Sequence, residues 1–65
     1  MKIVEYLVKC NTKQQKYTII CQDPTPAYHK YDGVYTSISA MMKAVLTITN
    51  ELRKQNIKAV FHYEY

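Results

Sequence analysis

The chain has 65 residues and a formal net charge of +4, with one glycine, two prolines and two cysteines. At 48% hydrophobic residues, its composition excludes disordered, collagen-like and low-complexity proteins, and its length allows one small domain (1–65). Because so short a chain buries only about 60% of its unfolded surface, it needs a well-packed core, a staple or a partner chain.

The first residues argue against a secretion signal, because Glu5 and Lys9 interrupt them before an apolar core could form. The longest uncharged stretch, 33–42, is far shorter than the roughly 20 residues of a membrane-spanning helix. We therefore expect a cytoplasmic protein with no membrane partner.

Two strands are predicted in the first third of the chain. Residues 3–10 alternate between two sides of an extended chain, which is typical of a β-strand. Residues 16–22 are rich in β-branched and aromatic residues and predict a second strand, with a polar hairpin loop at 11–14. We expect the register that brings the apolar residues together, with these pairs: Val8 and Tyr17, Tyr6 and Ile19, Val4 and Cys21.

This register separates the two cysteines. Cys10 and Cys21 would lie about 20 Å apart along the sheet, at about 3.3 Å per residue. Bridged cysteines need Cα atoms within about 7 Å, so we expect both residues to remain small hydrophobic side chains without a disulfide.

A tyrosine-rich loop follows the prolines at 24 and 26, which end the second strand because proline cannot donate to a ladder. The pair Asp32-Gly33 indicates a turn, and a short fourth strand within 27–35 is an open alternative. Tyrosine is favoured at binding hot spots, so we predict that this loop binds a protein. The predicted contact residues are Tyr28, His29, Lys30, Tyr31 and Tyr35. The alternative is that these rings cover one end of the core.

The clearest element is an amphipathic helix at about 37–55, with Thr36 or Ser37 as its N-cap and Asn56 as a left-handed C-cap. Its predicted core-facing arc consists of Ile38, Met41, Met42, Val45, Leu46, Ile48, Thr49 and Leu52.

Residues 57–65 alternate again and predict a strand that runs to the last residue. The fold class is therefore α+β: a small two-layer β-β-α-β domain with a mainly antiparallel three-stranded sheet and one helix on one face. The direction of the last strand stays open, because a short strand within the loop would reverse it. This pattern occurs in many unrelated domains and does not indicate a function.

The uncovered face of the predicted sheet is a candidate interface. It carries an aliphatic group with a polar rim, which is typical of a protein–protein contact. The residues of this face are Ile3, Leu7, Ile20, Val60 and His62. We expect a homodimer through this face or through the edge of the last strand. The alternative for the face is scattered surface hydrophobic residues, and the alternative for the edge is that Lys58 and Glu64 guard it against pairing.

Lysines cluster at the first hairpin, where Lys9, Lys13 and Lys16 with Tyr17 could contact a single-stranded nucleic acid. The cluster is small and contains no arginine, so a solvated loop tip is the favoured interpretation. The chain has one glycine, so a glycine-rich phosphate loop is excluded. The spacing of its cysteines and histidines does not suit a zinc site, and no catalytic residues, metal or cofactor are predicted.

The sequence thus predicts a non-enzymatic protein that binds another protein. Its size and composition suit an inhibitor or accessory factor of a phage or mobile element. The alternative is a nucleic-acid-binding module that uses the hairpin lysines.

Overall fold

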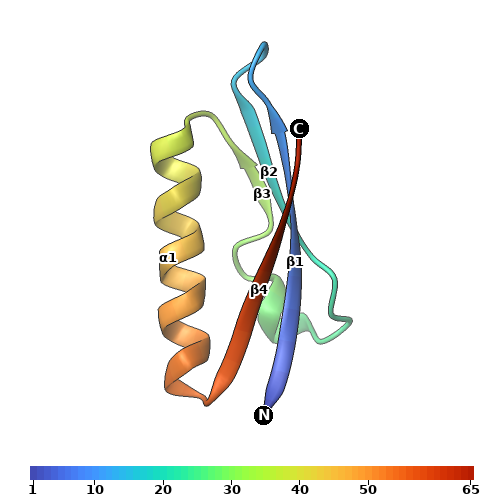
Figure 1. The fold of residues 1–65 in the computed structure, drawn as a ribbon, viewed down its shortest axis with the longest axis vertical. Helices are drawn as coiled ribbons and strands as arrows, with labels where there is room; N and C mark the ends of the chain where they lie inside the picture. Colours follow the sequence, from blue (N-terminus) through green and yellow to red (C-terminus); the bar gives the residue numbers. More distant parts are fainter.

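In the computed structural model, which describes residues 1–65, one helix lies against one face of a four-stranded sheet (Figure 1). The elements in chain order are β1 (Lys2–Asn11), β2 (Lys16–Cys21), the 3-10 helix η1 (Pro26–His29), β3 (Gly33–Tyr35), α1 (Ile38–Lys54) and β4 (Ile57–Glu64). The prediction of a small α+β domain with a single helix is confirmed.

The sheet is mixed and has four strands, whereas a mainly antiparallel sheet of three was predicted. β3 confirms the alternative of a short fourth strand within 27–35. The strand order is β3-β2-β1-β4, with antiparallel pairs β1–β2 and β2–β3 and a parallel pair β1–β4. The short strand β3 reverses the chain once more before α1, so β4 runs in the direction of β1 and β3. Parallel strands need a long crossover connection, and α1 supplies it.

The register of the β1–β2 hairpin differs from the predicted one by two residues. Tyr6 lies opposite Cys21 and not opposite Ile19. β1 continues to Asn11, and Gln15, with a left-handed φ of 52°, closes the turn. A shift of two residues leaves each side chain on its predicted face, because successive side chains of a strand alternate between the faces.

Both cysteines are free. Cys10 lies opposite Tyr17 and Cys21 lies opposite Tyr6, so the step from Tyr6 to Cys10 separates them along the sheet. Four residues of extended chain span about 13 Å, which is beyond the reach of a disulfide.

The predicted ends of α1 are confirmed to within a residue or two. The Oγ atom of Ser37 accepts a hydrogen bond from the Ala40 N–H at 3.1 Å and caps the first turn. Asn56 ends the helix in the left-handed region with a φ of 60°. No helix in the structure combines the length and the apolar character that crossing a membrane requires.

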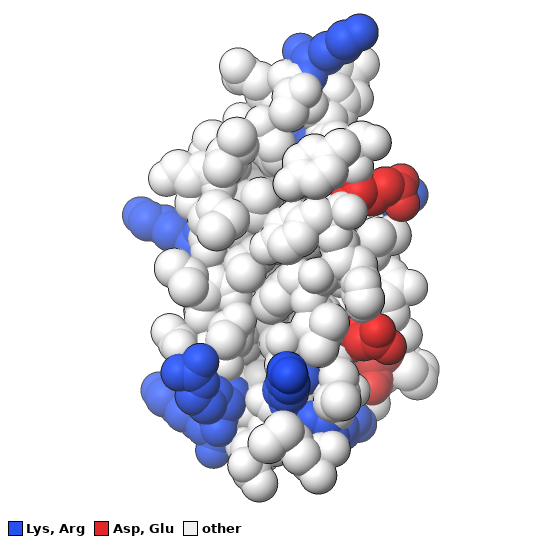
Figure 2. Space-filling view, in the orientation of Figure 1, with Lys and Arg blue, Asp and Glu red and all other residues white.

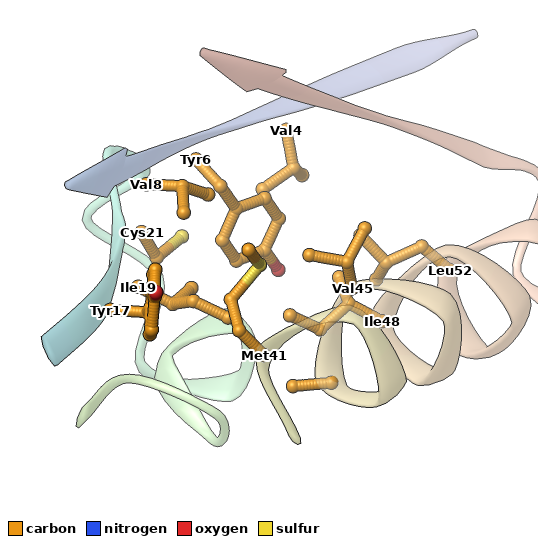
Figure 3. Close-up of a cluster of buried hydrophobic side chains, with 11 residues drawn as sticks. Val4, Tyr6, Val8, Tyr17, Ile19, Cys21, Met41, Val45, Ile48 and Leu52 are labelled. Atoms are coloured by element: carbon orange, nitrogen blue, oxygen red, sulfur yellow. The ribbon is translucent and has the colours of Figure 1, made fainter. Parts of the chain in front are cut away.

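The core lies between α1 and one face of the sheet (Figure 3). β1 and β2 contribute Val4, Tyr6, Val8, Tyr17, Ile19 and Cys21. The helix contributes Met41, Ala44, Val45, Ile48 and Leu52.

The helix is rotated relative to its predicted arc. Ala44, outside that arc, is buried, whereas Ile38, Met42 and Leu46 are 55%, 42% and 59% exposed. At about 100° per residue, the apolar positions from Ala44 to Leu46 span about 200° of the helix. A stripe somewhat over 100° wide is enough to face one sheet, so part of this surface stays in solvent.

Candidate functional site

The predicted sheet-face residues lie together on the side of the sheet that α1 does not cover. Leu7 in the central strand β1 lies opposite Ile20 of β2 and His62 of β4, and Glu5 lies opposite Val60. Ile3, the fourth aliphatic residue of this open sheet face, is 56% exposed at the start of β1. The alternation of each strand is what brings these side chains to one face.

Polar residues at this open sheet face lie next to one another on neighbouring strands. His62 Nε2 lies 2.8 Å from Glu5 Oε1, and the two side chains are 56% and 58% exposed. Lys9 lies opposite Glu64 one step further along the same ladder. Exposed pairs of this kind contribute only about 0–1 kcal/mol to stability, so they act as a polar rim beside Leu7.

The tyrosine-rich loop is fastened to the core. The Tyr6 hydroxyl donates to the Tyr28 carbonyl oxygen at 3.1 Å, and the Tyr35 hydroxyl donates to the Tyr31 carbonyl oxygen at 2.8 Å. The rings of Tyr28, Tyr31 and Tyr35 pack against the buried cluster. Lys30 is exposed, and its Nζ atom lies 3.5 Å from Glu51 Oε1 on α1. The loop therefore covers part of the core, and its role in binding stays a prediction.

His29 lies between Asp32 and the backbone of Asp23 and contacts both. Its Nδ1 atom lies 2.7 Å from Asp32 Oδ2, and its Nε2 atom contacts the Asp23 carbonyl oxygen. Asp32 also accepts the Cys21 N–H at 3.0 Å. Both ring nitrogens face acceptors, so both bonds form only when the imidazole carries two protons. The bond to the Asp32 carboxylate, followed by that to Asp23, raises the pKa of His29.

We expect the free energy of unfolding to fall as the pH rises from about 6.5 through the raised pKa of His29. The folded chain holds this proton at a pH where the unfolded chain has lost it. The stabilisation is therefore complete below the unfolded pKa and disappears above the folded one. Urea denaturation between about pH 5.5 and 8.5 measures the slope. His29→Gln and Asp32→Asn should each reduce it, and an unchanged slope in both variants would contradict this assignment.

Cys21, at the end of β2, and His29 of the loop do not form a nucleophile–base pair. The buried Cys21 thiol donates to the Asp23 carbonyl oxygen at 3.8 Å, and burial raises its pKa. Both nitrogens of His29 are engaged elsewhere. The structure also has no cluster of three or more His, Cys, Asp or Glu side chains that could hold a metal ion.

The residues of the predicted nucleic-acid contact do not form one surface, because the lysines are exposed and Tyr17 is buried. Lys9, Lys13 and Lys16 are exposed at and near the first hairpin. Tyr17 is only 5% exposed and belongs to the core, so its ring is not presented to a base.

A further apolar surface was missed by the sequence analysis, which placed its helical residues in the core. We call it the α1–β4 surface: Ile38, Met42 and Leu46 on α1, with Phe61 and Tyr63 on β4. Thr49 and Arg53 continue the helical line and border a hollow with the start of β4, which places the later part of this line on the β4 side of the helix. At the other end of the line, Ile38 borders a hollow with Gln15 and Tyr17 of the β1–β2 hairpin. Figure 2 shows a broad uncharged area from α1 to β4, with basic side chains at its lower end and acidic ones along its right margin. The sequence contained one sign of this surface: the apolar arc of the helix is wider than the stripe that one sheet can cover.

Comparisons of the chain with protein-family models, with curated proteins and with solved structures found no match.

Proposed function

We propose that this protein is a non-enzymatic domain that binds another protein on its open sheet face. The observation that carries the proposal is that a single helix covers one face of a four-stranded sheet, and the other face has an aliphatic centre. A sheet normally buries one face and solvates the other with polar residues. Here Leu7 and Ile20 stand side by side in the two central strands of the solvated face.

The arrangement of this face suits a protein partner. Leu7, Ile20 and Val60 are partly exposed and carry no charge, so a partner can desolvate them at little cost. The pair of Glu5 and His62 lies beside them and can stay hydrated at the rim. An apolar centre with a polar rim is the usual anatomy of a protein–protein interface.

Nucleic-acid binding is the less supported alternative. Stacking of bases on exposed aromatic rings contributes much of the affinity for single strands, and Tyr17 is buried. The three exposed lysines at and near one hairpin could then bind a nucleic acid only through its phosphates. The affinity of such a contact would fall steeply with added salt.

Leu7→Lys tests the proposal. We expect wild-type protein to capture a specific partner from host extract, and Leu7→Lys to weaken that partner's affinity by at least about tenfold. The matched control is Asn50→Lys, which adds the same charge at an exposed position of α1. Far-UV circular dichroism checks that both variants fold.

Equal capture of the partner by Leu7→Lys and Asn50→Lys would contradict the proposed docking surface. Capture that disappears on nuclease treatment or on addition of a polyanion would support the nucleic-acid alternative instead.

A further inference from the structure

The edge strand β4 is long and regular, and Lys58 and Glu64 are its two charged side chains. It pairs with β1 without interruption from Lys2–Ile57 to Lys9–Glu64, so it contains no bulge, and it has no proline. The opposite edge, β3, has only three residues. Proteins normally blunt a long edge with proline, a bulge or charged side chains, because its free backbone groups can pair with another strand. β4 has only the charges of Lys58 and Glu64, so its partner must be a strand that places opposite charges beside them.

The backbone groups that are free along β4 can be identified from the ladder. The Gln22 N–H donates to the Glu5 carbonyl oxygen at 2.8 Å, so Glu5 and the alternate residues of β1 point their backbone groups toward β2. Tyr6 therefore points toward β4 and bonds the two neighbours of its partner Phe61. The N–H and C=O groups of Phe61 itself then face the free side of the sheet.

The same alternation applies along the whole strand. The residues with free backbone groups are Ile57, Ala59, Phe61 and Tyr63. Their side chains lie on the helix side of the sheet, as the stacking of Phe61 on Tyr6 shows, with ring centroids 5.2 Å apart. The side chains of Lys58, Val60, His62 and Glu64 lie on the open sheet face.

β4 is complementary to itself in one antiparallel register. Two copies of β4 related by a two-fold axis can hydrogen-bond to each other only through these free backbone groups. Each residue of this set must therefore lie opposite an alternate residue of the partner strand whose backbone groups are also free. When the axis passes through Phe61, Lys58 of each copy lies opposite Glu64 of the other. In every other antiparallel register that joins the free backbone groups, Lys58 and Glu64 do not lie opposite each other. Opposite charges directly across two strands are stabilising, and like charges are destabilising.

The helix side fits the same register. Tyr63 of each copy lies opposite the small side chain of Ala59 of the other, and the two Phe61 side chains are neighbours. Tyr63 is 42% exposed in the isolated chain, so it has surface to bury. The exposed helical residues of the α1–β4 surface lie on this side, and the area around β4 in Figure 2 is free of charge over most of its extent.

We propose that a second copy of this chain binds the β4 edge in this register and joins the two four-stranded sheets into one of eight strands. The outer edges of that sheet are then the short β3 strands, so the assembly closes as a two-fold dimer. The inference goes beyond the proposed function, because the open sheet face with Leu7 remains free for a different protein.

Analytical ultracentrifugation tests the dimer, and exchange of the charges tests its register. Wild type should have twice the mass of the 7.7 kDa chain. Lys58→Glu and Glu64→Lys should each weaken dimerisation by about tenfold, because each homodimer then has two like-charge pairs. An equimolar mixture should recover wild-type affinity as a heterodimer, in which both pairs are again opposite in charge.

Ala59→Pro provides a second variant. It removes an N–H group that faces the free edge and leaves the ladder to β1 intact, so the chain should fold and remain monomeric. Circular dichroism and urea denaturation of every variant establish folding. Both charge changes are at exposed positions, where they should have little effect on the fold. Glu64→Lys also places a lysine opposite Lys9 of its own chain, so its stability should fall slightly more than that of Lys58→Glu.

Three outcomes would overturn the proposal. If wild type stays monomeric at millimolar concentration, a second copy does not bind the β4 edge, and only a strand of a different protein could pair with it. Charge variants that dimerise as wild type does, or a mixture that forms no heterodimer, would exclude this register. A monomer that still captures a partner through Leu7 would overturn the dimer alone and leave the proposed function standing.

Discussion

Tyr6→Ala is expected to lower the free energy of unfolding by about 3–5 kcal/mol, the usual cost of removing a buried aromatic side chain. The Tyr6 side chain is 1% exposed, its ring stacks on Phe61, and its hydroxyl bonds the Tyr28 carbonyl at 3.1 Å. It therefore joins β1, β4 and the tyrosine-rich loop. Domains have about 0.05–0.15 kcal/mol of stability per residue, so this loss would unfold a large fraction of so small a protein.

Urea denaturation followed by far-UV circular dichroism measures the effect. Tyr6→Phe keeps the stacked ring and removes only the bond to the Tyr28 carbonyl, so it should cost about 1 kcal/mol. Tyr65→Ala, at a side chain that is 91% exposed, should change stability very little. If Tyr6→Ala were as stable as Tyr65→Ala, the central position of this ring in the core would be wrong.

Ile48→Ala is expected to cost about 2–5 kcal/mol, whereas Leu46→Ala should stay within about 0.5 kcal/mol of wild type. The two residues are two positions apart on α1. Ile48 is 2% exposed in the middle of the helix–sheet contact, and Leu46 is 59% exposed on the α1–β4 surface. Each change deletes three side-chain carbon atoms and hardly alters helix propensity, so the difference reports which side of the helix faces the sheet.

Thermal and urea unfolding of the two variants should be compared at a concentration where both are monomeric, since Leu46 borders the proposed dimer contact. Equal destabilisation by the two changes would mean that the apolar arc is buried as a whole, as the sequence analysis expected. That result would remove the α1–β4 surface from the exposed part of the molecule.

Much of the secondary structure and one candidate surface follow from local chemistry. Alternation in 3–10, 16–22 and 57–65 specifies which side chains share a face whatever the register, because the side-chain period of a strand is two. Ile3, Leu7, Ile20 and Val60 were therefore placed together correctly although the hairpin register was wrong by two residues. The helix ends were also readable, because Ser37 and Asn56 satisfy the backbone at its two ends by local bonds and conformation.

The sequence analysis named the edge of the last strand as a candidate contact, but the direction and register of that edge required the tertiary structure. Three residues at Gly33–Tyr35 form a strand only because β2 offers them a partner, and that strand reverses the direction of everything after it. The parallel pairing of β4 with β1 then determines which backbone groups are free and which charges can meet across the edge.

The sequence by itself determined the kind of each long element and the faces of its strands, because these depend on residues close together in the chain. The tertiary structure decided the strand direction, the hairpin register and how much of the helical apolar arc is buried. These depend on how much surface one small sheet can offer, and Ile38, Met42 and Leu46 remain exposed because a single sheet cannot cover an arc of about 200°.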